Sequence, residues 1–526
     1  MTQVTTGSTR FRTLTTAALL LAMLLASLDQ VIIATSIPQI AADLGDMKHY
    51  AWVFSAYMIA ELLGMPIFGK LSDMYGRKPF ITAAVILFIA GSILCGIAQS
   101  MPALIIFRVL QGLGAGAIMP IAFAIVFEIY PQQLRNRMQS VMSAVYAISS
   151  VMGPIIGAVL TDYLNWRWIF YVNLPLGLVS MLLLLKFYRE TRVQEEKPSI
   201  DWPGLVLLFS SIVGLLLLFE LGGKSFSWLS WPIISLGMVA AVSIVAFVAV
   251  ELRRSNPFIP IELFRGRMFA ICQTVGFFQG MVMMAAFTFI PLFIQTVNGG
   301  SASETGGMIM PLSISIVISS FIGGKLVSRI SFRSALLLSN GLIVVSLLLF
   351  RTMDASTPDW GIGLDMVLLG LGIGLSFPVI YNVSLSRIHP SQWGTVNALI
   401  PFFRSVGGIM GVSLLSSIQY REFMRGLAQL PSSIDLSVDI ADAGSLLRHI
   451  GEQGKAATAE VWRTAAEALM TSIRHVFDWS FVIALLPLIA GLWIGRTKLM
   501  THPEVPPELE GLPPEELMKL LHQREA

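Results

Sequence analysis

The sequence predicts an all-α membrane protein built from two six-helix bundles and two inserted helices. Three observations predict this fold. Apolar runs, each near the roughly 20 residues that cross a bilayer, recur along the whole chain. Only 13% of the 526 residues are charged, against about 25% in soluble domains, and the mean hydropathy is +0.74. Short motifs also occur twice, in the same order.

Fourteen membrane spans account for the apolar runs. Each must be helical, because backbone groups in hydrocarbon have to satisfy their own hydrogen bonds. We interpret the first run as a retained signal anchor, since no soluble chain follows it. The predicted spans are residues 14–38, 51–71, 80–99, 102–127, 138–163, 168–187, 201–221, 231–250, 268–295, 305–329, 334–351, 361–386, 395–420 and 478–496.

Lysine and arginine set the predicted orientation, because basic residues gather in cytoplasmic loops. With the N-terminus in the cytoplasm, most of the 35 basic residues lie on the inner side. The short outer loops then hold only Lys48, Arg167, Lys224 and Arg351. Both termini are therefore predicted to be cytoplasmic, in an inner or plasma membrane. The net charge of only +3 leaves no footprint for a nucleic-acid partner.

Three stretches are repeated at an offset of 254 to 258 residues. They are GKLSDMYGRK (69–78) with GKLVSRISFR (324–333), GLGAGAIMP (112–120) with GLGIGLSFP (370–378), and GPIIG (153–157) with GGIMG (407–411). Each match joins spans that run in the same direction, so the repeat is parallel. Parallel six-span halves are an arrangement of secondary transporters, whose substrate sites lie near the midplane between the halves.

The repeat divides the chain into four parts. They are an N-terminal six-helix bundle (1–195), two inserted spans (196–256), a C-terminal six-helix bundle (257–500) and a cytoplasmic tail (501–526). The second bundle includes an extracytoplasmic loop, 421–476. An apolar stripe from Val461 to Val476 predicts a helix that lies on the membrane or acts as a lid, with a solvated loop as the alternative.

GKLSDMYGRK, residues 69–78, lies in the short inner loop after the second span. It matches the signature G-x-L-x-D-x-x-G-R-K of the major facilitator superfamily at every defined position. The resemblance implies a latch that holds the cytoplasmic side shut in the outward-facing state; an ordinary positive-inside loop is the alternative. The latch residues are Gly69, Asp73, Gly76, Arg77 and Lys78.

The chemistry of this loop agrees with such a role. Gly69 allows close helix approach, and Gly76 suits a turn with positive φ. Asp73 is expected to cap a neighbouring helix or to pair with Arg77 or Arg135.

Three further stretches resemble motifs of this superfamily. IIFRVLQGLGAGAI (105–118) resembles the fourth-span motif R-x-x-Q-G-x-G. SSVMGPIIGAVL (149–160) resembles the fifth-span antiporter motif at Gly153, Pro154 and Gly157, with Ser149 and Ser140 in place of two earlier glycines. The resemblance associates that motif with export, and a generic seam of small residues is the alternative. LDQVIIATSIP (28–38) is similar to the first span of the fourteen-span drug:proton antiporters, with Val31 in place of the usual threonine.

Asp29 stands alone in an apolar span, where a charged side chain costs roughly 3 kcal/mol on insertion scales. Asp29, Glu61 and Arg108 lie at comparable predicted depth, ~9–15 Å below the outer surface. We predict one network, in which Arg108 faces both carboxylates and one carboxylate exchanges a proton or binds substrate. The alternatives are a purely structural Asp29–Arg108 bridge, an arginine that reaches the outer surface, and a Glu61 bonded within the bundle.

The C-terminal half has no acid equivalent to Asp29, because the matching position lies near Met284. Methionine and phenylalanine in that span are expected to line an adaptable apolar cavity or to face lipid. The candidate pocket residues are Gln111, Met284, Asn382 and Arg404. Arg404 has a second interpretation, as a partner of helix C-termini or of lipid phosphate.

Two glycine-rich stretches resemble nucleotide-binding motifs only superficially. GMPIFGKL (64–71) lacks the Ser/Thr of a P-loop, and GLGAGA (112–117) lies inside a span with no strand before it. We therefore expect no catalytic residue, no cofactor and no metal, with the proton gradient as the energy source.

The resulting hypothesis is a monomeric, proton-coupled multidrug efflux antiporter that confers antibiotic resistance by alternating access. Its partners are small lipophilic or cationic substrates, protons and the lipid bilayer. Two rivals remain: a transporter of the same fold for one metabolite or siderophore, and a membrane receptor or scaffold without transport.

Overall fold

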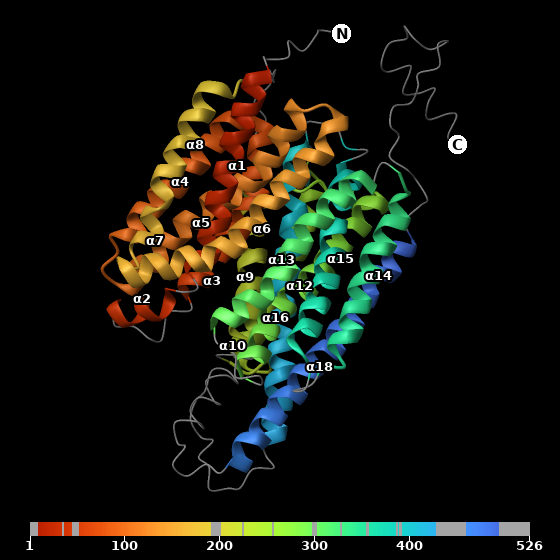
Figure 1. The fold of residues 1–526 in the computed structure, drawn as a ribbon. Coiled ribbons are helices and arrows are strands. Elements are labelled where there is room, and N and C mark those ends of the chain that lie inside the picture. The colour runs from red at the N-terminus through yellow and green to blue at the C-terminus, as the bar shows by residue number, and fades with distance from the viewer. Residues whose placement is uncertain are drawn as a thin grey trace.

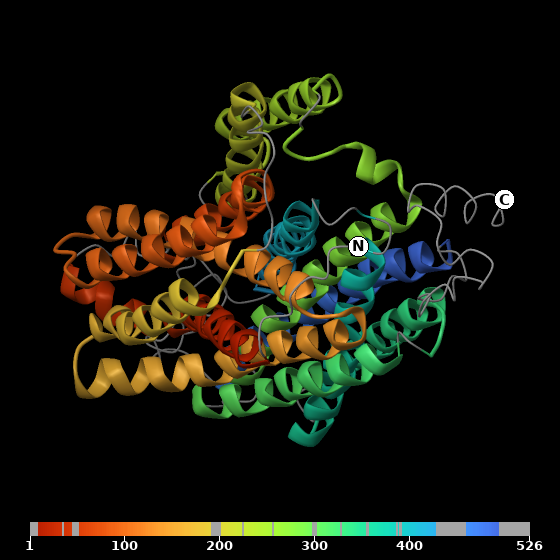
Figure 2. The same ribbon diagram turned by 90° about the horizontal axis from the view of Figure 1, so that it is seen from above.

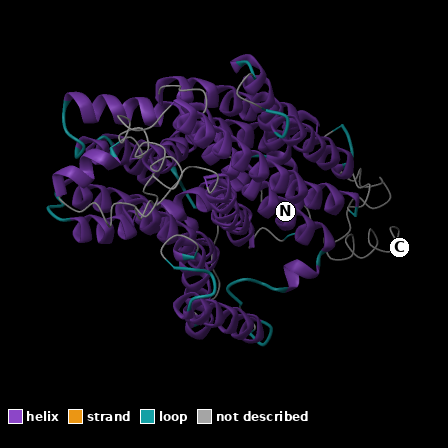
Figure 3. Ribbon diagram, turned by 90° about the horizontal axis from the view of Figure 1, so that it is seen from below, coloured by secondary structure: helices purple, strands orange, loops and turns teal. Residues whose placement is uncertain are grey.

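The computed structural model describes residues 9–33, 36–44, 52–190, 201–222, 226–254, 257–296, 302–326, 329–353, 357–385, 388, 392–427 and 459–493. This part of the chain is almost entirely helical and contains no named strand (Figures 1 and 3). Among the described residues, thirteen helices are long and apolar enough to cross a membrane. The predicted all-α membrane class is confirmed. The remaining predicted span, 138–163, lies in a helix, but that helix is not one of the thirteen.

The helices form two bundles and an inserted pair. The N-terminal bundle contains α1 (Thr9–Ile32), α3 (Trp52–Tyr75), α4 (Arg77–Gly96), α5 (Met101–Ile129), α6 (Gln132–Tyr163) and α8 (Asn173–Phe187), with short α2 (Ile37–Leu44) and α7 (Trp168–Tyr171). The inserted pair is α9 (Trp202–Leu221) and α10 (Trp231–Glu251). The C-terminal bundle contains short α11 (Glu262–Arg265), then α12 (Arg267–Thr296), α13 (Ala302–Leu326), α14 (Phe332–Phe350), α15 (Asp359–Leu385), α16 (Trp393–Leu427) and α18 (Ala459–Leu492).

The two bundles repeat the same helix pairing. α3 packs on α5 as α13 packs on α15, and α1 packs on α6 as α12 packs on α16. Two reciprocal contacts, α3 with α16 and α6 with α13, join the bundles. We call the end at which α3 meets α4 the inner end and the opposite end the outer end; the basic residues predict that the inner end is cytoplasmic.

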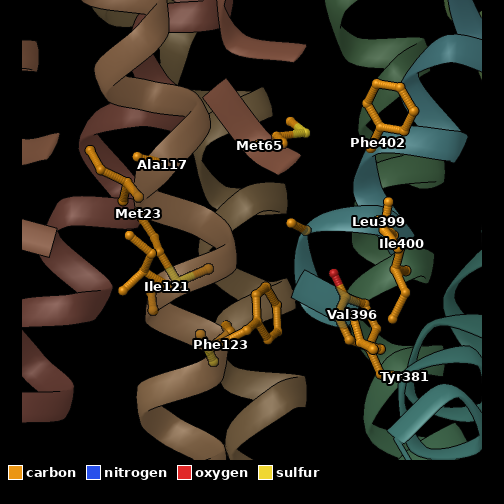
Figure 4. Close-up of a cluster of buried hydrophobic side chains, with 14 of the residues drawn as sticks. Met23, Met65, Ala117, Ile121, Phe123, Tyr381, Val396, Leu399, Ile400 and Phe402 are labelled. Carbon is orange, nitrogen blue, oxygen red and sulfur yellow. The ribbon is translucent and has the colours of Figure 1, made fainter. Parts of the chain in front are cut away.

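Apolar side chains fill the junction between the bundles near the inner end. In Figure 4, residues of α3 and α5 face residues of α15 and α16. The ring of Phe123 stacks on that of Tyr381, with 4.8 Å between the ring centroids. Val396 of α16 has no exposed surface. The bundles are thus packed together at this level.

The inserted helices α9 and α10 pack on each other and project from the side of the molecule (Figure 2). α9 touches one helix of each bundle, α3 and α16. The Ser413 hydroxyl donates to the Phe219 carbonyl (2.6 Å), and the Trp228 indole donates to the Ser417 hydroxyl (3.1 Å). The insertion therefore lies beside the junction of the bundles and leaves their mutual contacts intact.

Two sequence predictions about helix ends are wrong. The first span ends at Ile32, and a separate helix α2 follows, so 14–38 is not one helix. The predicted spans 395–420 and 478–496 are also too short, because α16 continues to Leu427 and α18 begins at Ala459. The described residues of segment 421–476 therefore belong to these two helices. Residues 428–458 and the tail 501–526 lie outside the described residues.

The apolar stripe of α18 is a seam between helices. Leu469, Ile473 and Val476 are buried, and the Gln419 amide of α16 donates to the Ser472 hydroxyl of α18 (3.0 Å). The stripe repeats at helical spacing because it packs against a second helix, so the prediction of a membrane-lying helix or lid is wrong.

Glycine allows the closest helix contacts in the N-terminal bundle. A Cβ atom added at Gly116 of α5 would lie 2.1 Å from the Glu61 carbonyl oxygen of α3, and one at Gly112 would lie 2.4 Å from the Tyr57 carbonyl. Close approach matters in a bilayer, because van der Waals packing and not the hydrophobic effect drives helix association there.

We predict that Gly116→Ala lowers the free energy of unfolding by about 2 kcal/mol, because the added methyl group overpacks the α3–α5 contact. Gly341→Ala in α14 is the matched control, since an added Cβ there meets nothing within 4 Å. That control should be neutral or stabilised by about 0.5–1 kcal/mol. Thermal unfolding of both purified variants in detergent checks the prediction, and equal stabilities would contradict it.

Candidate functional site

Arg108 is the centre of a buried polar network. Its side chain has no exposed surface, and its Nη1 lies 2.5 Å from Oδ2 of Asp29. It also donates to the Gln111 amide oxygen (2.7 Å) and to the Val53 carbonyl (3.2 Å). Its guanidinium carbon lies 3.9 Å from the centre of the Tyr57 ring. The protein thus replaces much of the water that this charge would otherwise require, although the buried Nη2 has no hydrogen-bond partner among the described residues.

The other oxygen of Asp29 has two amide partners. Oδ1 accepts hydrogen bonds from Gln111 and from Asn173 of α8, both at 2.8 Å. Each amide also donates to the Ser92 hydroxyl of α4, at 2.7 and 3.3 Å. Four helices therefore supply side chains to one network, and Gln111 belongs to this network and not to an open pocket.

An apolar cluster covers the Asp29–Arg108 pair towards the outer end. Its members include Leu28, Ile32, Val53, Leu104, Trp166 and Phe170. Asp43 of α2 secures this cover by accepting hydrogen bonds from Trp166 (2.9 Å) and Arg167 (2.8 Å). The Arg167 hydrogen bond, and then that of Trp166, lowers the pKa of Asp43. The predicted alternative, in which Arg108 reaches the outer surface, is wrong.

Glu61 forms no hydrogen bond or ion pair with Arg108, so the predicted direct contact of Arg108 with both carboxylates is absent among the described residues, although Arg108 and Asp29 lie within electrostatic range of Glu61. Tyr57, one helical turn nearer the outer end, covers the face of the guanidinium, and the acceptors Val53, Asp29 and Gln111 occupy its Nε and Nη1. The Nη2 nitrogen has no hydrogen-bond partner among the described residues. The Glu61 side chain is partly exposed and forms no hydrogen bond with the part of the chain that the structure describes. Asp29 is thus neutralised by a direct ion pair with Arg108, whereas Glu61 has no such ion pair among the described residues.

Asp73 caps the first turn of a helix in the opposite bundle. Its Oδ1 accepts from the Gly394 backbone N–H (3.0 Å), and its Oδ2 accepts from the Thr395 backbone N–H (2.7 Å) and hydroxyl (3.1 Å). At the same contact, a Cβ atom added to Gly69 would lie 2.6 Å from the Cβ atom of Ala398. A carboxylate at a helix N-terminus is stabilised by unpaired N–H groups and by the helix dipole.

The basic residues of the loop tie Asp73 to its own bundle. Arg77 lies 3.5 Å from Asp73 and 2.5 Å from the carboxylate of Glu128. Gly76 has a φ of 103°, and the backbone N–H groups of Arg77 and Lys78 both donate to Glu190. The positive φ explains why glycine occupies this turn. Arg135, the other predicted partner of Asp73, stacks on Trp393 instead.

The antiporter motif lies at the seam between α6 and α1. A Cβ added at Gly153 would lie 3.1 Å from the Val31 Cβ, two residues from Asp29. Gly157 is also buried, and the Pro154 side chain lies outside the described residues. The motif therefore sets how closely α6 approaches the helix that carries Asp29.

The remaining candidate residues are dispersed over the C-terminal bundle. Met284 packs against Gly408, where an added Cβ would lie 2.7 Å from the Met284 Cγ. The Asn382 amide donates to a carbonyl of its own helix at 2.6 Å. The Arg404 guanidinium stacks on Phe377, 4.0 Å from the ring centre. Among the described residues, no hydrogen bond joins Met284, Asn382 and Arg404 to one another.

Sequence reasoning missed several polar partners. Asn173 and Ser92 complete the Asp29 network, and a lone asparagine in the apolar run VNLPLG was the available signal. In the C-terminal bundle, Gln279 donates to Asn340 (3.0 Å) and accepts from Ser376 (2.8 Å), with all three buried. That bundle thus carries a buried cluster of uncharged polar side chains.

The family model described as Major Facilitator Superfamily matches residues 19–412. The chain belongs to this superfamily. It is 37% identical to "Multidrug resistance protein 3" of Bacillus subtilis, over 95% of this chain and 98% of that protein. It is 36% identical to "Multidrug transporter protein MdtP" of the same organism, over 78% of this chain and 76% of that protein.

Solved structures of the superfamily share the fold. A double-tryptophan variant of XylE is 14% identical, with a TM-score of 0.59, and the match covers 96% of this chain and 98% of that one. The human organic anion transporter MFSD10 is 16% identical, with a TM-score of 0.56, over 90% and 99% of the two chains. These identities support the fold alone. The family model and the two bacterial relatives show that the chain is a multi-pass membrane transporter of this superfamily.

We predict that Arg108→Gln lowers the free energy of unfolding by about 3–5 kcal/mol, because Asp29 is left buried without its cation. The double variant Asp29→Asn/Arg108→Gln should recover part of this loss, since neither charge remains. Unfolding in detergent, treated as a double-mutant cycle, measures the coupling.

Arg167→Gln is the matched control for this cycle. It removes an arginine from a partly exposed pair with Asp43, and such pairs contribute about 1 kcal/mol or less. If Arg108→Gln were as mild as Arg167→Gln, the buried pair would not support the bundle.

Proposed function

We propose that the protein is a proton-coupled antiporter of the inner or plasma membrane that exports amphiphilic, cationic compounds by alternating access. The observation that carries the proposal is the partly exposed Glu61, which has no hydrogen-bond partner among the described residues and lies beside a buried, neutralised ion pair. The names of the two bacterial relatives, a multidrug resistance protein and a multidrug transporter, support drugs as the cargo.

Coupling follows from the cost of an unpaired charge within the membrane. Glu61 is neutral when it is protonated and is compensated when a cationic substrate binds, whereas the empty, ionised carboxylate is the costly state. The two bundles therefore reorient most readily with either a proton or a substrate on Glu61, which makes the exchange obligatory. Asp29 does not need this compensation, because Arg108 already supplies it.

The inward proton gradient supplies the driving force. A tenfold proton gradient supplies about 1.4 kcal/mol, and each charge moved through 100 mV supplies about 2.3 kcal/mol. Export of a cation against its own gradient uses this energy. Both termini of the chain face the cytoplasm in this scheme.

We infer that the Asp73 contact acts as the latch of the inner side. It joins α3 of one bundle to the first turn of α16 in the other, and the apolar junction of Figure 4 lies next to it. Separation of the bundles at this end breaks the cap and exposes the junction, which gives the inward-facing state. When the bundles close again, the Asp73 cap re-forms and the apolar junction is buried again.

The first test is ethidium transport by purified protein in proteoliposomes under an imposed pH gradient. We predict that Glu61→Gln abolishes proton-driven transport, because the amide cannot exchange a proton. Downhill ethidium exchange without a gradient should persist at a reduced rate. Asp365→Asn is the matched control: Asp365 is a buried carboxylate of α15 with no side-chain hydrogen bond to a described residue, and it lies in the other bundle.

Proton-driven transport by Glu61→Gln at the wild-type rate would show that Glu61 is not the carboxylate that exchanges the proton. If Asp29→Asn, still folded, alone lost the coupling, the exchange would belong to Asp29. If the wild-type protein ignored ethidium and related cations, a dedicated substrate would replace the multidrug assignment.

The second test concerns the latch. We predict that Asp73→Asn speeds alkylation of a cysteine introduced by Val396→Cys about fivefold, because loss of a charged cap weakens closure by about 1 kcal/mol. The natural Cys95 and Cys272 are both buried. N-ethylmaleimide labelling in membranes measures the rate.

Asp201→Asn is the control for the latch test. Asp201 caps its own helix, α9, through the Gly204 N–H (3.1 Å), and does not join the bundles. An unchanged labelling rate in Asp73→Asn, or an equal increase in Asp201→Asn, would show that the cap does not hold the bundles together.

A further inference from the structure

A groove of about 480 Å³ opens on the side of the molecule near the outer end. Leu414 and Ile418 of α16, one helical turn apart, form one wall. Trp479 and Ile483 of α18, also one turn apart, form the other. Leu414 is 39% exposed and Trp479 is 52% exposed, so this apolar surface is open along its length. Its volume lies within the roughly 300–1,000 Å³ typical of ligand sites.

One end of the groove is polar and cationic. Arg421 lies on the same face of α16 as Leu414 and Ser417, and its Nε donates to the Ser417 carbonyl (3.3 Å). No carboxylate of the described chain lies within ion-pair distance of Arg421. Glu422, its neighbour in sequence, pairs with Arg425 (2.6 Å). The terminal nitrogens of Arg421 therefore remain available to an anion.

The position of Arg421 corresponds to the headgroup level of a bilayer. Arg421 follows Trp393, the first residue of α16, by about 42 Å of helix at 1.5 Å per residue. A bilayer with its headgroups is about 40–45 Å thick. The loop residue Trp228 joins the groove here through its hydrogen bond to Ser417, and tryptophan favours this interface.

We propose that this groove binds a phospholipid of the leaflet at the outer end. Its phosphate pairs with the Arg421 guanidinium, since arginine matches phosphate through two parallel hydrogen bonds. One acyl chain runs from there towards the inner end, between Leu414 and Ile483. Trp228 lies against the glycerol region. An amphiphilic cation is a poor occupant, because its charge meets the charge of Arg421.

The test is native mass spectrometry of the full chain, purified in detergent, delipidated and titrated with phosphatidylglycerol. A diglucosyl diacylglycerol with the same acyl chains is the phosphate-free probe. Arg421→Gln should weaken phosphatidylglycerol binding about tenfold, in line with the loss of charge-assisted hydrogen bonds, and should leave glycolipid binding unchanged. Arg425→Gln, one turn further along α16 and outside the groove, is the matched control and should bind as the wild type does.

Leu414→Trp gives a test that does not depend on charge, because the larger side chain fills the groove and should displace both lipids. Millimolar inorganic phosphate should not compete, which separates a lipid site from a site for free phosphate. Equal effects of Arg421→Gln and Arg425→Gln, or phosphatidylglycerol binding unaffected by Leu414→Trp, would overturn the proposal. If phosphate competed, or if ethidium and not lipid were displaced by Leu414→Trp, the occupant would be a different one and the proposal would be wrong.

Discussion

A guanidinium group in the middle of an apolar bundle is the constraint around which the N-terminal half is built. Arg108 can be buried only if oxygen atoms surround it, and α1, α3 and its own helix α5 supply them. α8 and α4 then supply Asn173 and Ser92, which complete the shell of Asp29. The glycines of α5 support this arrangement, because they bring the α3 backbone close enough for its carbonyl at residue 53 to reach the arginine. Chemistry and packing therefore constrain each other here.

The two bundles share a packing plan but not its chemistry. The same helix pairs touch in each half, which explains why short motifs recur at a nearly constant spacing. The first half holds a buried ion pair, whereas the second holds a buried cluster of uncharged side chains that includes Gln279 and Asn340, at a different position along the repeat. In the mechanism that we propose, the proton exchanges on Glu61 of the N-terminal half, and the C-terminal half contributes largely apolar helices such as α12. This division suits amphiphilic substrates, which have one charged end and one apolar end.

The sequence predicts those structural features whose causes lie in neighbouring residues, and it does not predict those that depend on contacts between distant residues. Spans and fold class follow from apolar runs and repeats, which are local, and the pairing of Asp29 with Arg108 follows from the cost of burying either alone. The exclusion of Glu61 could not be seen, because it depends on where the Tyr57 ring points. The partners of Asp73 lie in a helix that begins 320 residues later. Hydropathy placed the end of α16 too early, because a helix can continue beyond the membrane when a second helix covers its apolar face.

The 35-residue helix α16 has a consequence for how distant events communicate. It is about 52 Å long. It carries the Asp73 contact at one end and Arg421 of the groove near the other. For a straight helix of this length, a tilt of about 10° displaces the far end by about 9 Å. The thickness and lateral pressure of the surrounding bilayer thus act on the same helix as the inner closure. If the groove holds a lipid as we propose, membrane composition at the outer end would bear on the inner closure through this one helix.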